Sequence, residues 1–185
     1  MPRSSHKREQ LLNAATDLVY RQGFHRTSLA DIAKASEVPL GNVYYYFKTK
    51  EDIVQAVMER RSHEFLSLFE GWDKLNDPRA RLNAFLEMVI SISSTLTEHG
   101  CPIGSLCQEL GKDHPIHASA AAGVLKNTIA WVSQQYTELG LANAQALGTQ
   151  FVALLQGAIL LANTLGDPLI LTKQMHYLKN QIETL

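Results

Sequence analysis

The ten residues from Gly41 to Lys50, GNVYYYFKTK, place aromatic hydroxyls beside lysine ammonium groups. Both groups can hydrogen-bond to the oxygens of a phosphate. Successive side chains on an α-helix point about 100° apart, so Tyr44, Tyr45 and Tyr46 cannot share one face. We therefore expect the tyrosines to divide, with some in contact with a partner and at least one near the protein interior. The alternative is that all three are core residues and the lysines ordinary surface charge.

Thr49, with Asp52 three residues later, resembles the cap of a longer helix. Lys50 falls in the first turn of this predicted helix, which is an unusual position for a cation. A cation there opposes the helix macrodipole by roughly 0.3–1 kcal/mol. The position is favourable if a phosphate lies beside it, held by the ammonium group and the helix N-terminus together. Lys48 and the hydroxyls of Thr27 and Ser28 would hold the same nucleic-acid strand.

Two short helices joined by a tight turn are predicted to position these side chains. Ser28, with Asp31 three residues later, resembles a capping box for the first helix. The second begins near Leu40, and its Val43 and Phe47 are spaced to pack inward. This is the layout of a helix-turn-helix motif. The predicted DNA contacts are Thr27, Ser28, Leu40, Gly41, Asn42, Tyr44, Tyr45, Tyr46, Lys48 and Lys50.

The rest of the chain also favours helices, so the predicted fold class is all-α. Period-2 alternation and hairpin signals are absent from the sequence. The pairs Asp77-Pro78 and Asp167-Pro168 are typical of helix starts. We expect an N-terminal three-helix helix-turn-helix domain over residues 1–48 and a C-terminal helical ligand-binding and dimerisation domain over 49–185. A helix over residues 50–70 links the two.

Composition restricts the context of the protein. Residues 1–61 hold ten Lys/Arg against seven Asp/Glu, a net charge of +3, and the remainder holds seven against eleven, a net charge of -4. A polyanion would therefore bind the N-terminal part. There are two cysteines and no apolar leader in MPRSSHKREQ, which favours a reduced, cytoplasmic location. The most apolar stretch, FVALLQGAILLANTLG, is shorter than the roughly 20 residues that span a bilayer, and we expect a buried helix there.

The segment GFHRTSLADIAKASEVPLGNVYYYFKTKEDIV resembles the signature of the TetR family of bacterial transcriptional regulators. The match runs over about residues 8–60 and ends in Val-x-x-Gly-x-Val-Tyr-x-Tyr-Phe and Lys-x-Lys-Glu. The resemblance implies a homodimer that binds a palindromic operator and is released, as a repressor, by a small-molecule inducer. One position departs from the pattern, because Glu37 stands where the turn usually holds glycine. A left-handed conformation there would strain Glu37 by about 1–2 kcal/mol.

The resemblance also implies an apolar ligand cavity in the second domain and a dimer formed by the last two helices. The helix over 142–165 has apolar residues on two faces, which independently favours a partner surface. The predicted ligand-binding residues are Phe85, Met88, Val89, Ile92, Leu106, Leu110, Trp131, Phe151 and Leu155. The predicted dimer interface is Phe151, Leu154, Ala158, Leu161, Leu165, Leu171, Met175, Leu178 and Ile182.

Cys101 is a candidate sensor thiol. It lies in GCPIGSLCQEL, just before a predicted helix start, where a thiolate is stabilised. The protein would then sense electrophiles or oxidants. The alternative is that Cys101 and Cys107 serve as small apolar side chains. Together with His114 and His117 they match no strong metal motif, so no metal site is predicted.

Enzymatic activity is not expected. The sequence has no nucleophile elbow, phosphate loop or carboxylate pair, and the histidines are scattered. No catalytic residue and no cofactor is predicted. A helical adaptor that binds other proteins through its apolar stripes, without DNA specificity, is the remaining alternative. The expected partners are thus double-stranded operator DNA, a small-molecule inducer and a second copy of the chain, with no membrane.

Overall fold

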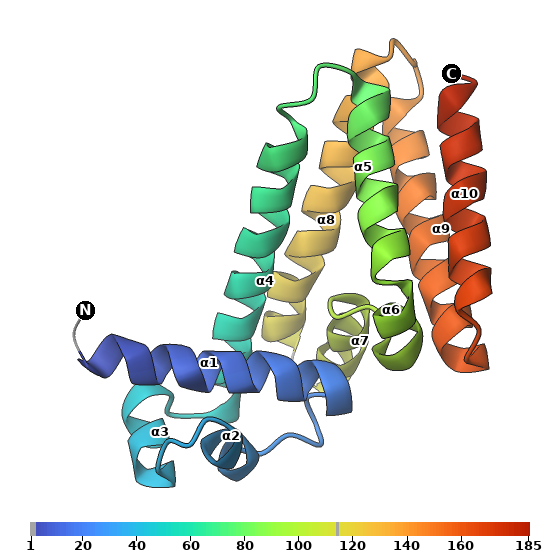
Figure 1. The fold of residues 1–185 in the computed structure, drawn as a ribbon. Coiled ribbons are helices and arrows are strands. Elements are labelled where there is room, and N and C mark those ends of the chain that lie inside the picture. Colours follow the sequence, from blue (N-terminus) through green and yellow to red (C-terminus); the bar gives the residue numbers. More distant parts are fainter. Residues whose placement is uncertain (1–2, 114) are drawn as a thin grey trace. The chain divides into compact units, whose positions relative to one another are not determined.

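The computed structural model describes the backbone of residues 3–113 and 115–185 and the side chains of 6–111 and 122–185. Over these residues the chain forms ten α-helices and no strand, which confirms the all-α prediction (Figure 1). The helices are α1 Arg3–Gln22, α2 Leu29–Ala35, α3 Leu40–Tyr46, α4 Lys50–Trp72, α5 Pro78–Ser91, α6 Ser93–His99, α7 Gly104–Asp113, α8 Pro115–Glu138, α9 Ala144–Leu165 and α10 Pro168–Glu183.

Contacts divide the chain into two compact units. The N-terminal unit is Met1–His63 with Ser105–Ala122, and the C-terminal unit is Glu64–Gly104 with Gly123–Leu185. The helices α4, α7 and α8 each begin in one unit and end in the other. The domain boundary predicted at residues 48–49 stays a prediction.

The N-terminal unit is built on α1, α2 and α3, and α2 packs against both of the others. Its core contains Ile32 from α2 and Val43 from α3, both fully buried, together with Leu11 from α1. The predicted capping box at the start of α2 is present, because the Ser28 hydroxyl accepts from the Asp31 N–H and the Asp31 carboxylate accepts from the Ser28 N–H.

The turn between α2 and α3 contains a non-glycine residue in the left-handed region. Glu37 has a φ of 57°, and it is the only non-glycine residue with positive φ in the described part of the chain. The conformation brings the N–H of Val38 to the carbonyl of Ala33, at 3.1 Å, and Val38 is buried. The strain expected at Glu37, about 1–2 kcal/mol, is therefore present in the fold.

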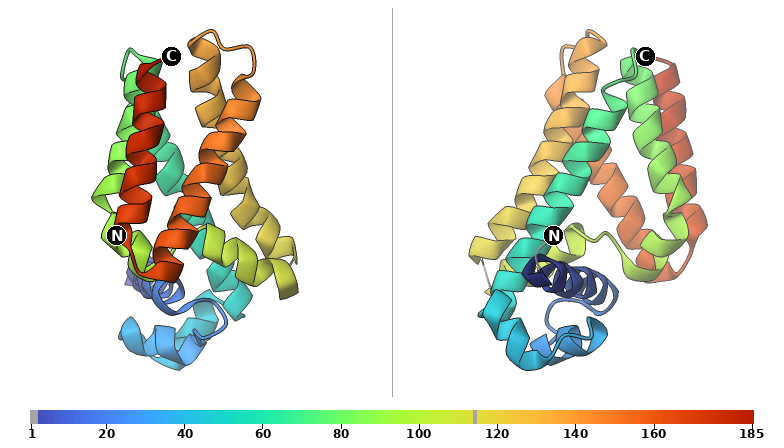
Figure 2. Two further views of the ribbon diagram at one scale, coloured as in Figure 1. Left: turned by 90° about the vertical axis from the view of Figure 1, so that its right-hand side faces the viewer. Right: turned by 60° about the vertical axis from the view of Figure 1, so that its left-hand side comes forward.

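The C-terminal unit places α10 against both α9 and α5 (Figure 2). The Asp77 and Asp167 caps form as predicted, each followed by proline in the first turn. The helix that starts at Asp77-Pro78 is interrupted at Ile92, where φ is −107° and ψ is 16°. Helix α6 starts immediately after this break, so the apolar periodicity continues across two helices.

Helix α9 spans 22 residues, Ala144–Leu165, and agrees with the helix predicted over 142–165. Within the described residues it is the one helix long and apolar enough to cross a membrane. The core helix of a globular protein has the same properties, and eight residues of α9 are buried in the C-terminal unit.

Candidate functional site

Helix α3 presents two different faces, as the sequence predicted. Val43 and Phe47 are 0% and 3% exposed, whereas Tyr44 and Tyr45 are 48% and 74% exposed. Tyr46 is half-buried, and its ring meets that of Tyr45 edge-on at a centroid distance of 4.9 Å. The tyrosines therefore divide between solvent and the protein interior.

The first residues of α3 are accessible to solvent. Leu40 is 42% exposed, and Asn42 is half-buried with its backbone N–H bonded to the Pro39 carbonyl at 2.8 Å. Gly41 is exposed, and a Cβ built at this position would have no atom within 4 Å. The backbone of α3 can therefore be approached closely at Gly41 by a large partner.

An open hollow of about 430 Å³ lies beside α3 in the N-terminal unit. It brings together half of the predicted DNA contacts, namely Thr27, Ser28, Leu40, Tyr44 and Lys50. Sequence reasoning missed His25, Arg26, Leu29 and Ala30, which line the same hollow. The signal was available, because these residues flank the N-cap residue Ser28 on both sides. Gly41, Asn42, Tyr45, Tyr46 and Lys48 do not line it.

Thr27 differs from the other predicted contacts because it is 1% exposed. Its hydroxyl donates to the Gly23 carbonyl at 2.7 Å and accepts from Gln22 Nε2 at 3.2 Å. A hydroxyl engaged in this way fixes the turn after α1. Thr27 thus supports the wall of the hollow as a buried residue. Its neighbours Arg26 and Ser28 are exposed to solvent.

Ser28 is occupied by the α2 cap. Its hydroxyl donates to Asp31 Oδ2 at 2.6 Å, and the hydrogen bonds from the Ser28 side chain and backbone lower the pKa of Asp31. A deprotonated Asp31 keeps the cap formed, so the start of α2 is held in one conformation beside the hollow.

Lys50 is held in place rather than extended into solvent. Its Nζ donates to the His25 carbonyl at 3.3 Å and lies 4.1 Å from the centroid of the Phe24 ring. Partial burial lowers the pKa of Lys50, against the opposite influence of nearby Glu51, Glu109 and Asp31. The ammonium group is therefore partly desolvated at the edge of the hollow, where its attraction to an anion is stronger than in bulk water.

Lys48 and Asp52 organise the junction between α3 and α4. The Lys48 Nζ donates to the Tyr44 carbonyl at 3.0 Å at the end of α3. The Asp52 carboxylate accepts from the N–H groups of Lys48 and Thr49, and the Asp52 N–H donates to the Thr49 hydroxyl. The predicted Thr49–Asp52 cap is thus formed, and both lysines begin from a fixed backbone.

The C-terminal unit holds a cluster of aromatic rings that includes three of the predicted ligand-binding residues. Trp131 stacks on Phe69 at 4.8 Å with an interplanar angle of 11°, and Trp72 stacks on Phe85 at 5.4 Å. Phe85 also contacts Phe151 at 5.6 Å. Phe69 and Trp72 were not among the predicted ligand-binding residues. Their spacing with Phe65, at i, i+4 and i+7 along α4, was the signal.

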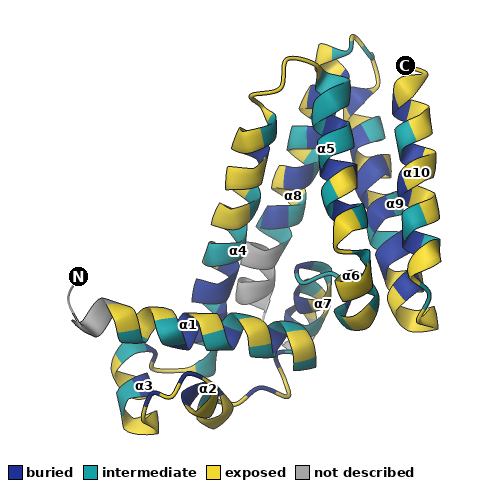
Figure 3. Cartoon of the chain, viewed as in Figure 1, coloured by how far each residue is buried: buried dark blue, intermediate teal, exposed yellow. Residues whose placement is uncertain are grey.

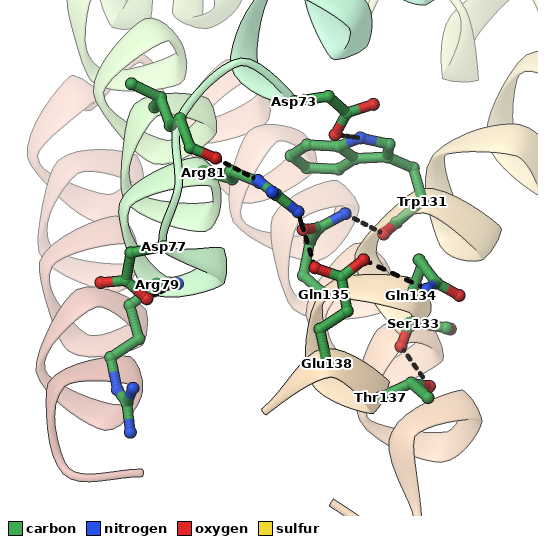
Figure 4. Close-up of polar contacts among 11 residues, drawn as sticks. Asp73, Asp77, Arg79, Arg81, Trp131, Ser133, Gln134, Gln135, Thr137 and Glu138 are labelled. Carbon is green, nitrogen blue, oxygen red and sulfur yellow. Dashed lines mark hydrogen bonds and ion pairs between the residues drawn. The ribbon is translucent and has the colours of Figure 1, made fainter. Parts of the chain in front are cut away.

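Polar contacts fix one edge of this cluster (Figure 4). The Trp131 Nε1 donates to Asp73 Oδ1 at 2.9 Å. The Arg81 guanidinium donates to Gln135 Oε1 at 3.1 Å and to Glu138 Oε2 at 2.7 Å, which ties α5 to α8. Trp131 is half-buried, so part of its ring remains available at the cluster surface.

The other predicted ligand residues do not form one group. Val89 and Leu155 are buried in the same core and Met88 packs against it, whereas Ile92 is 40% exposed at the α5–α6 break. Leu106 and Leu110 are buried but belong to the N-terminal unit.

Most of the predicted dimer residues lie in the core of the same chain. The buried ones are Phe151, Ala158, Leu171, Met175, Leu178 and Ile182. Leu154 is half-buried, and only Leu161 and Leu165 are exposed, at 51% and 65%. Periodicity identified a buried face of α10, and the structure covers that face with α5 and α9 of the same protomer.

A second cavity of about 300 Å³ lies in the C-terminal unit among α8, α9 and α10. Its wall includes Phe151, Leu154 and Leu178, together with Tyr136 and Tyr177. Burial raises the pKa of Tyr136, so its hydroxyl stays protonated and can donate a hydrogen bond.

Cys101 is a free, half-buried thiol. Its Sγ accepts from the Gly104 N–H at 3.3 Å and from Gln156 Nε2 at 3.4 Å. The described residues contain no group of three potential metal ligands. His114 and the side chain of His117 lie outside the described part of the structure.

Comparisons with known proteins agree with this arrangement. The family described as bacterial regulatory proteins, tetR family, matches residues 11–57. The domain described as the C-terminal domain of LmrA/YxaF-like transcriptional regulators matches residues 78–175.

Individual proteins are similar over nearly the whole length. The chain is 31% identical to the HTH-type transcriptional regulator LmrA of Bacillus subtilis (strain 168), over 85% of this chain and 86% of that protein. It is 29% identical to the uncharacterized HTH-type regulator YxaF of the same organism, over 89% and 90%. A TetR family regulator from Agrobacterium tumefaciens shares the fold, with a TM-score of 0.87 at 19% identity over 96% of this chain and 98% of that chain.

TetR family members are DNA-binding transcriptional regulators and not enzymes, and they typically act as dimers. The helix-turn-helix with its exposed tyrosines and the fully helical C-terminal unit fit this description. The chain belongs to the TetR family of transcriptional regulators, with an LmrA/YxaF-like C-terminal domain.

Proposed function

We propose that this protein is a cytoplasmic, ligand-responsive repressor that binds a palindromic operator as a homodimer. A small-molecule inducer, bound in the C-terminal unit, lowers its affinity for the operator. The single observation that carries the DNA-binding face is the exposure of Tyr44 and Tyr45 beside the open hollow.

The proposed DNA contacts follow from the chemistry of this face. Tyr44 and Tyr45 offer rings to base edges or sugars and hydroxyls to phosphate oxygens. Gly41 allows α3 to approach the base edges closely, and Asn42 can pair with a base edge or a phosphate. One DNA strand would pass between Lys50, Lys48 and Ser28. The proposed DNA-binding face also includes Leu40 and Tyr46. The buried Thr27 supports it from below.

The test is operator binding by variants of this face. DNA from beside the protein's own gene, or a selected random pool, supplies the operator, and fluorescence anisotropy measures the Kd. Tyr44→Ala and Lys50→Ala should each weaken binding by about tenfold or more, since two protomers contribute to each complex. Lys74→Ala makes the same charge change on an exposed loop of the C-terminal unit and should leave the Kd unchanged. Unchanged affinity in both Tyr44→Ala and Lys50→Ala would refute this face.

The proposed inducer site is the aromatic cluster around Trp131, with Phe85, Phe151 and the neighbouring Met88, Val89 and Leu155 as its wall. Stacked rings and a partly exposed tryptophan suit a flat, largely apolar molecule. Differential binding to two states of the regulator supplies the coupling to DNA.

Both tryptophans of the protein, Trp72 and Trp131, lie in this cluster. A screen of small aromatic compounds can therefore use intrinsic tryptophan fluorescence as a local reporter. A true inducer should quench or shift this emission and weaken operator binding at the same concentration. A compound that changes the emission without affecting the operator Kd is not the inducer.

The proposed homodimer uses the outward side of α9 and α10. Leu161 and Leu165, both exposed, are the predicted interface residues that remain available, with Leu154 at the margin. The buried members of the predicted interface belong to the core that supports this surface.

Sensing through Cys101 is the second candidate, because the two N–H donors at its Sγ would stabilise a thiolate. A low concentration of N-ethylmaleimide or hydrogen peroxide should then weaken operator binding in the wild type but not in Cys101→Ser. Cys107→Ser is the matched control and should respond as the wild type does. An identical response in all three proteins would exclude Cys101 as the sensor.

A further inference from the structure

Glu109, in the middle of α7, contacts the turn that follows α1. The backbone N–H of His25 donates to Glu109 Oε2 at 3.2 Å. A Cβ built on Gly23 would lie 2.8 Å from Glu109 Oε1 and 3.1 Å from Oε2, so the carboxylate rests directly on this glycine. Residue 109 and the turn are far apart in sequence but belong to the same compact unit.

Gly23 meets two requirements at this point. Its φ of +86° is one that other residues rarely adopt, and it ends α1 with a hydrogen bond to the Val19 carbonyl at 3.0 Å. Its missing side chain also leaves the space that the carboxylate fills. The backbone conformation at Gly23 and its missing side chain thus leave room for an acidic side chain from α7.

Lys50 also holds this turn. Its Nζ donates to the carbonyl of His25, whose N–H is bound to Glu109. One peptide segment is thus clamped between an anion on α7 and a cation at the start of α4. Glu109 also favours the charged form of Lys50 by its electrostatic attraction.

This clamped segment leads directly into the proposed DNA-binding face. His25, Arg26, Ser28 and Lys50 all line the open hollow beside α3. The hydroxyl of Thr27 bonds back to the Gly23 carbonyl, so a displacement of the turn at Gly23 would also displace the residues that follow. Glu109 itself does not line the hollow.

We propose that Glu109 is a positioning residue for operator binding, which fixes the Gly23–Thr27 turn and the Lys50 ammonium group in the geometry that receives a phosphate. The proposal rests on the DNA-binding function proposed above. Helix α7 begins at Gly104 in the C-terminal unit and carries Glu109 within the N-terminal unit. A displacement of α7 would therefore release both of the contacts that Glu109 makes.

The test compares Glu109→Ala and Glu109→Gln with wild-type protein in operator titrations at several salt concentrations. Glu109→Ala should weaken specific binding by about tenfold, because it removes a charge-assisted hydrogen bond and the anion next to Lys50. If Lys50 no longer meets its phosphate, the slope of log K against log salt should fall by about one for each protomer. Loss of a negative charge would by itself strengthen non-specific DNA binding, so a weaker operator complex cannot be a simple charge effect.

A double-mutant cycle with Lys50→Ala tests whether Glu109 acts through Lys50. The two effects should be clearly less than additive. An unchanged salt slope in Glu109→Ala, or full additivity with Lys50→Ala, would overturn the proposal, because Glu109 would then only support the fold. If Glu109→Ala does not fold, as judged by circular dichroism, Glu109→Gln decides. It retains an acceptor for the His25 N–H, and wild-type affinity and slope in this variant would also overturn the proposal.

Two controls separate this proposal from the DNA-binding function on which it rests. Gln108→Ala changes the exposed neighbouring position on α7 and should bind as the wild type does. If wild-type protein binds no operator, the proposed function fails. If Tyr44→Ala loses binding while Glu109→Ala retains both affinity and slope, only the role of Glu109 is refuted.

Discussion

Apolar side chains are exposed on α3 and on α9 and α10 among other places in the described residues, and the chemistry of these two surfaces differs. The α3 surface consists of Leu40, Gly41, Tyr44 and Tyr45. The α9–α10 surface consists of Leu160, Leu161, Leu165, Leu169 and Tyr177, and the exposed residues along these helices can be followed in Figure 3.

The difference indicates two kinds of partner. Tyrosine keeps a hydroxyl for a wet, charged partner, and Lys48 and Lys50 lie close to the α3 surface in the sequence. The α9–α10 surface is mostly leucine. Contact with a partner is favourable for leucine only because burial removes its apolar surface from water. Apolar exposure alone therefore does not identify a partner, and the polar groups at its edge decide between nucleic acid and protein.

The largest expected effect comes from charging the α9–α10 surface. The double variant Leu161→Glu, Leu165→Glu should abolish dimerisation, because each unpaired charge buried at an interface costs about 3–5 kcal/mol and a two-fold dimer buries every charge twice. Light scattering after gel filtration should show a monomer. The operator affinity should fall with it, since one protomer then binds only one half-site.

Leu75→Glu is the matched control, because Leu75 is 39% exposed in the loop before α5. It should remain dimeric. A double variant that stays dimeric at micromolar concentration would show that this surface is not the interface.

A second prediction contrasts the salt dependence of the two surfaces. Operator affinity should fall by about 10³-fold or more between 50 and 200 mM salt if a dimer neutralises at least six phosphates. The dimer dissociation constant should change by much less over the same range, because apolar burial is not screened. Anisotropy and analytical ultracentrifugation provide the two measurements. Operator binding that is flat in salt would contradict phosphate contacts by Lys48 and Lys50.

A smaller effect is expected at the turn that carries α3. Glu37→Gly should raise the free energy of unfolding by about 1 kcal/mol, because it relieves a left-handed conformation at φ 57°. The flexibility that glycine adds to the unfolded chain offsets part of this gain. Thermal denaturation gives the value, with Glu70→Gly on exposed α4 as a control that should destabilise. A lower Tm for Glu37→Gly would mean that the Glu37 side chain contributes a contact that outweighs the strain.

The smallest effect concerns the pH dependence of the α2 cap. The pKa of Asp31 is lowered from 3.8 in the folded protein by its hydrogen bonds with Ser28, so Asp31 stabilises the fold above its ordinary pKa and this contribution is lost as pH falls through the lower, folded value. Between about pH 5 and pH 3 the Tm of Asp31→Asn should therefore fall less steeply than that of the wild type. Parallel curves would show that the cap does not persist in solution.

Local patterns were predicted well. The Ser28–Asp31 and Thr49–Asp52 caps depend on residues three positions apart, and both form. The two faces of α3 follow from helical geometry alone. The sequence left the conformation at Glu37 open, because the family signature usually holds glycine there and glutamate itself gives no signal for a left-handed turn.

Features that depend on distant contacts were not predicted. Periodicity shows that one face of α10 is buried, but it does not show whether α5 and α9 or a second protomer covers it. The contacts of Lys50 with Phe24 and His25, and of Glu109 with Gly23, join residues that are 25 to 86 positions apart, and the sequence pattern holds no signal for such pairs. The break at Ile92 preserves the apolar spacing and is therefore also hidden in the pattern.

Gly41 has a consequence for the evolution of new operators. A glycine within a helix costs about 0.5–1 kcal/mol relative to alanine, and no neighbouring atom would obstruct a side chain at this position. The fold itself therefore tolerates many residues at position 41, while any side chain placed there would project toward the proposed DNA. A library randomised at this one codon should yield proteins that are as stable as the parent yet differ in the half-site they prefer.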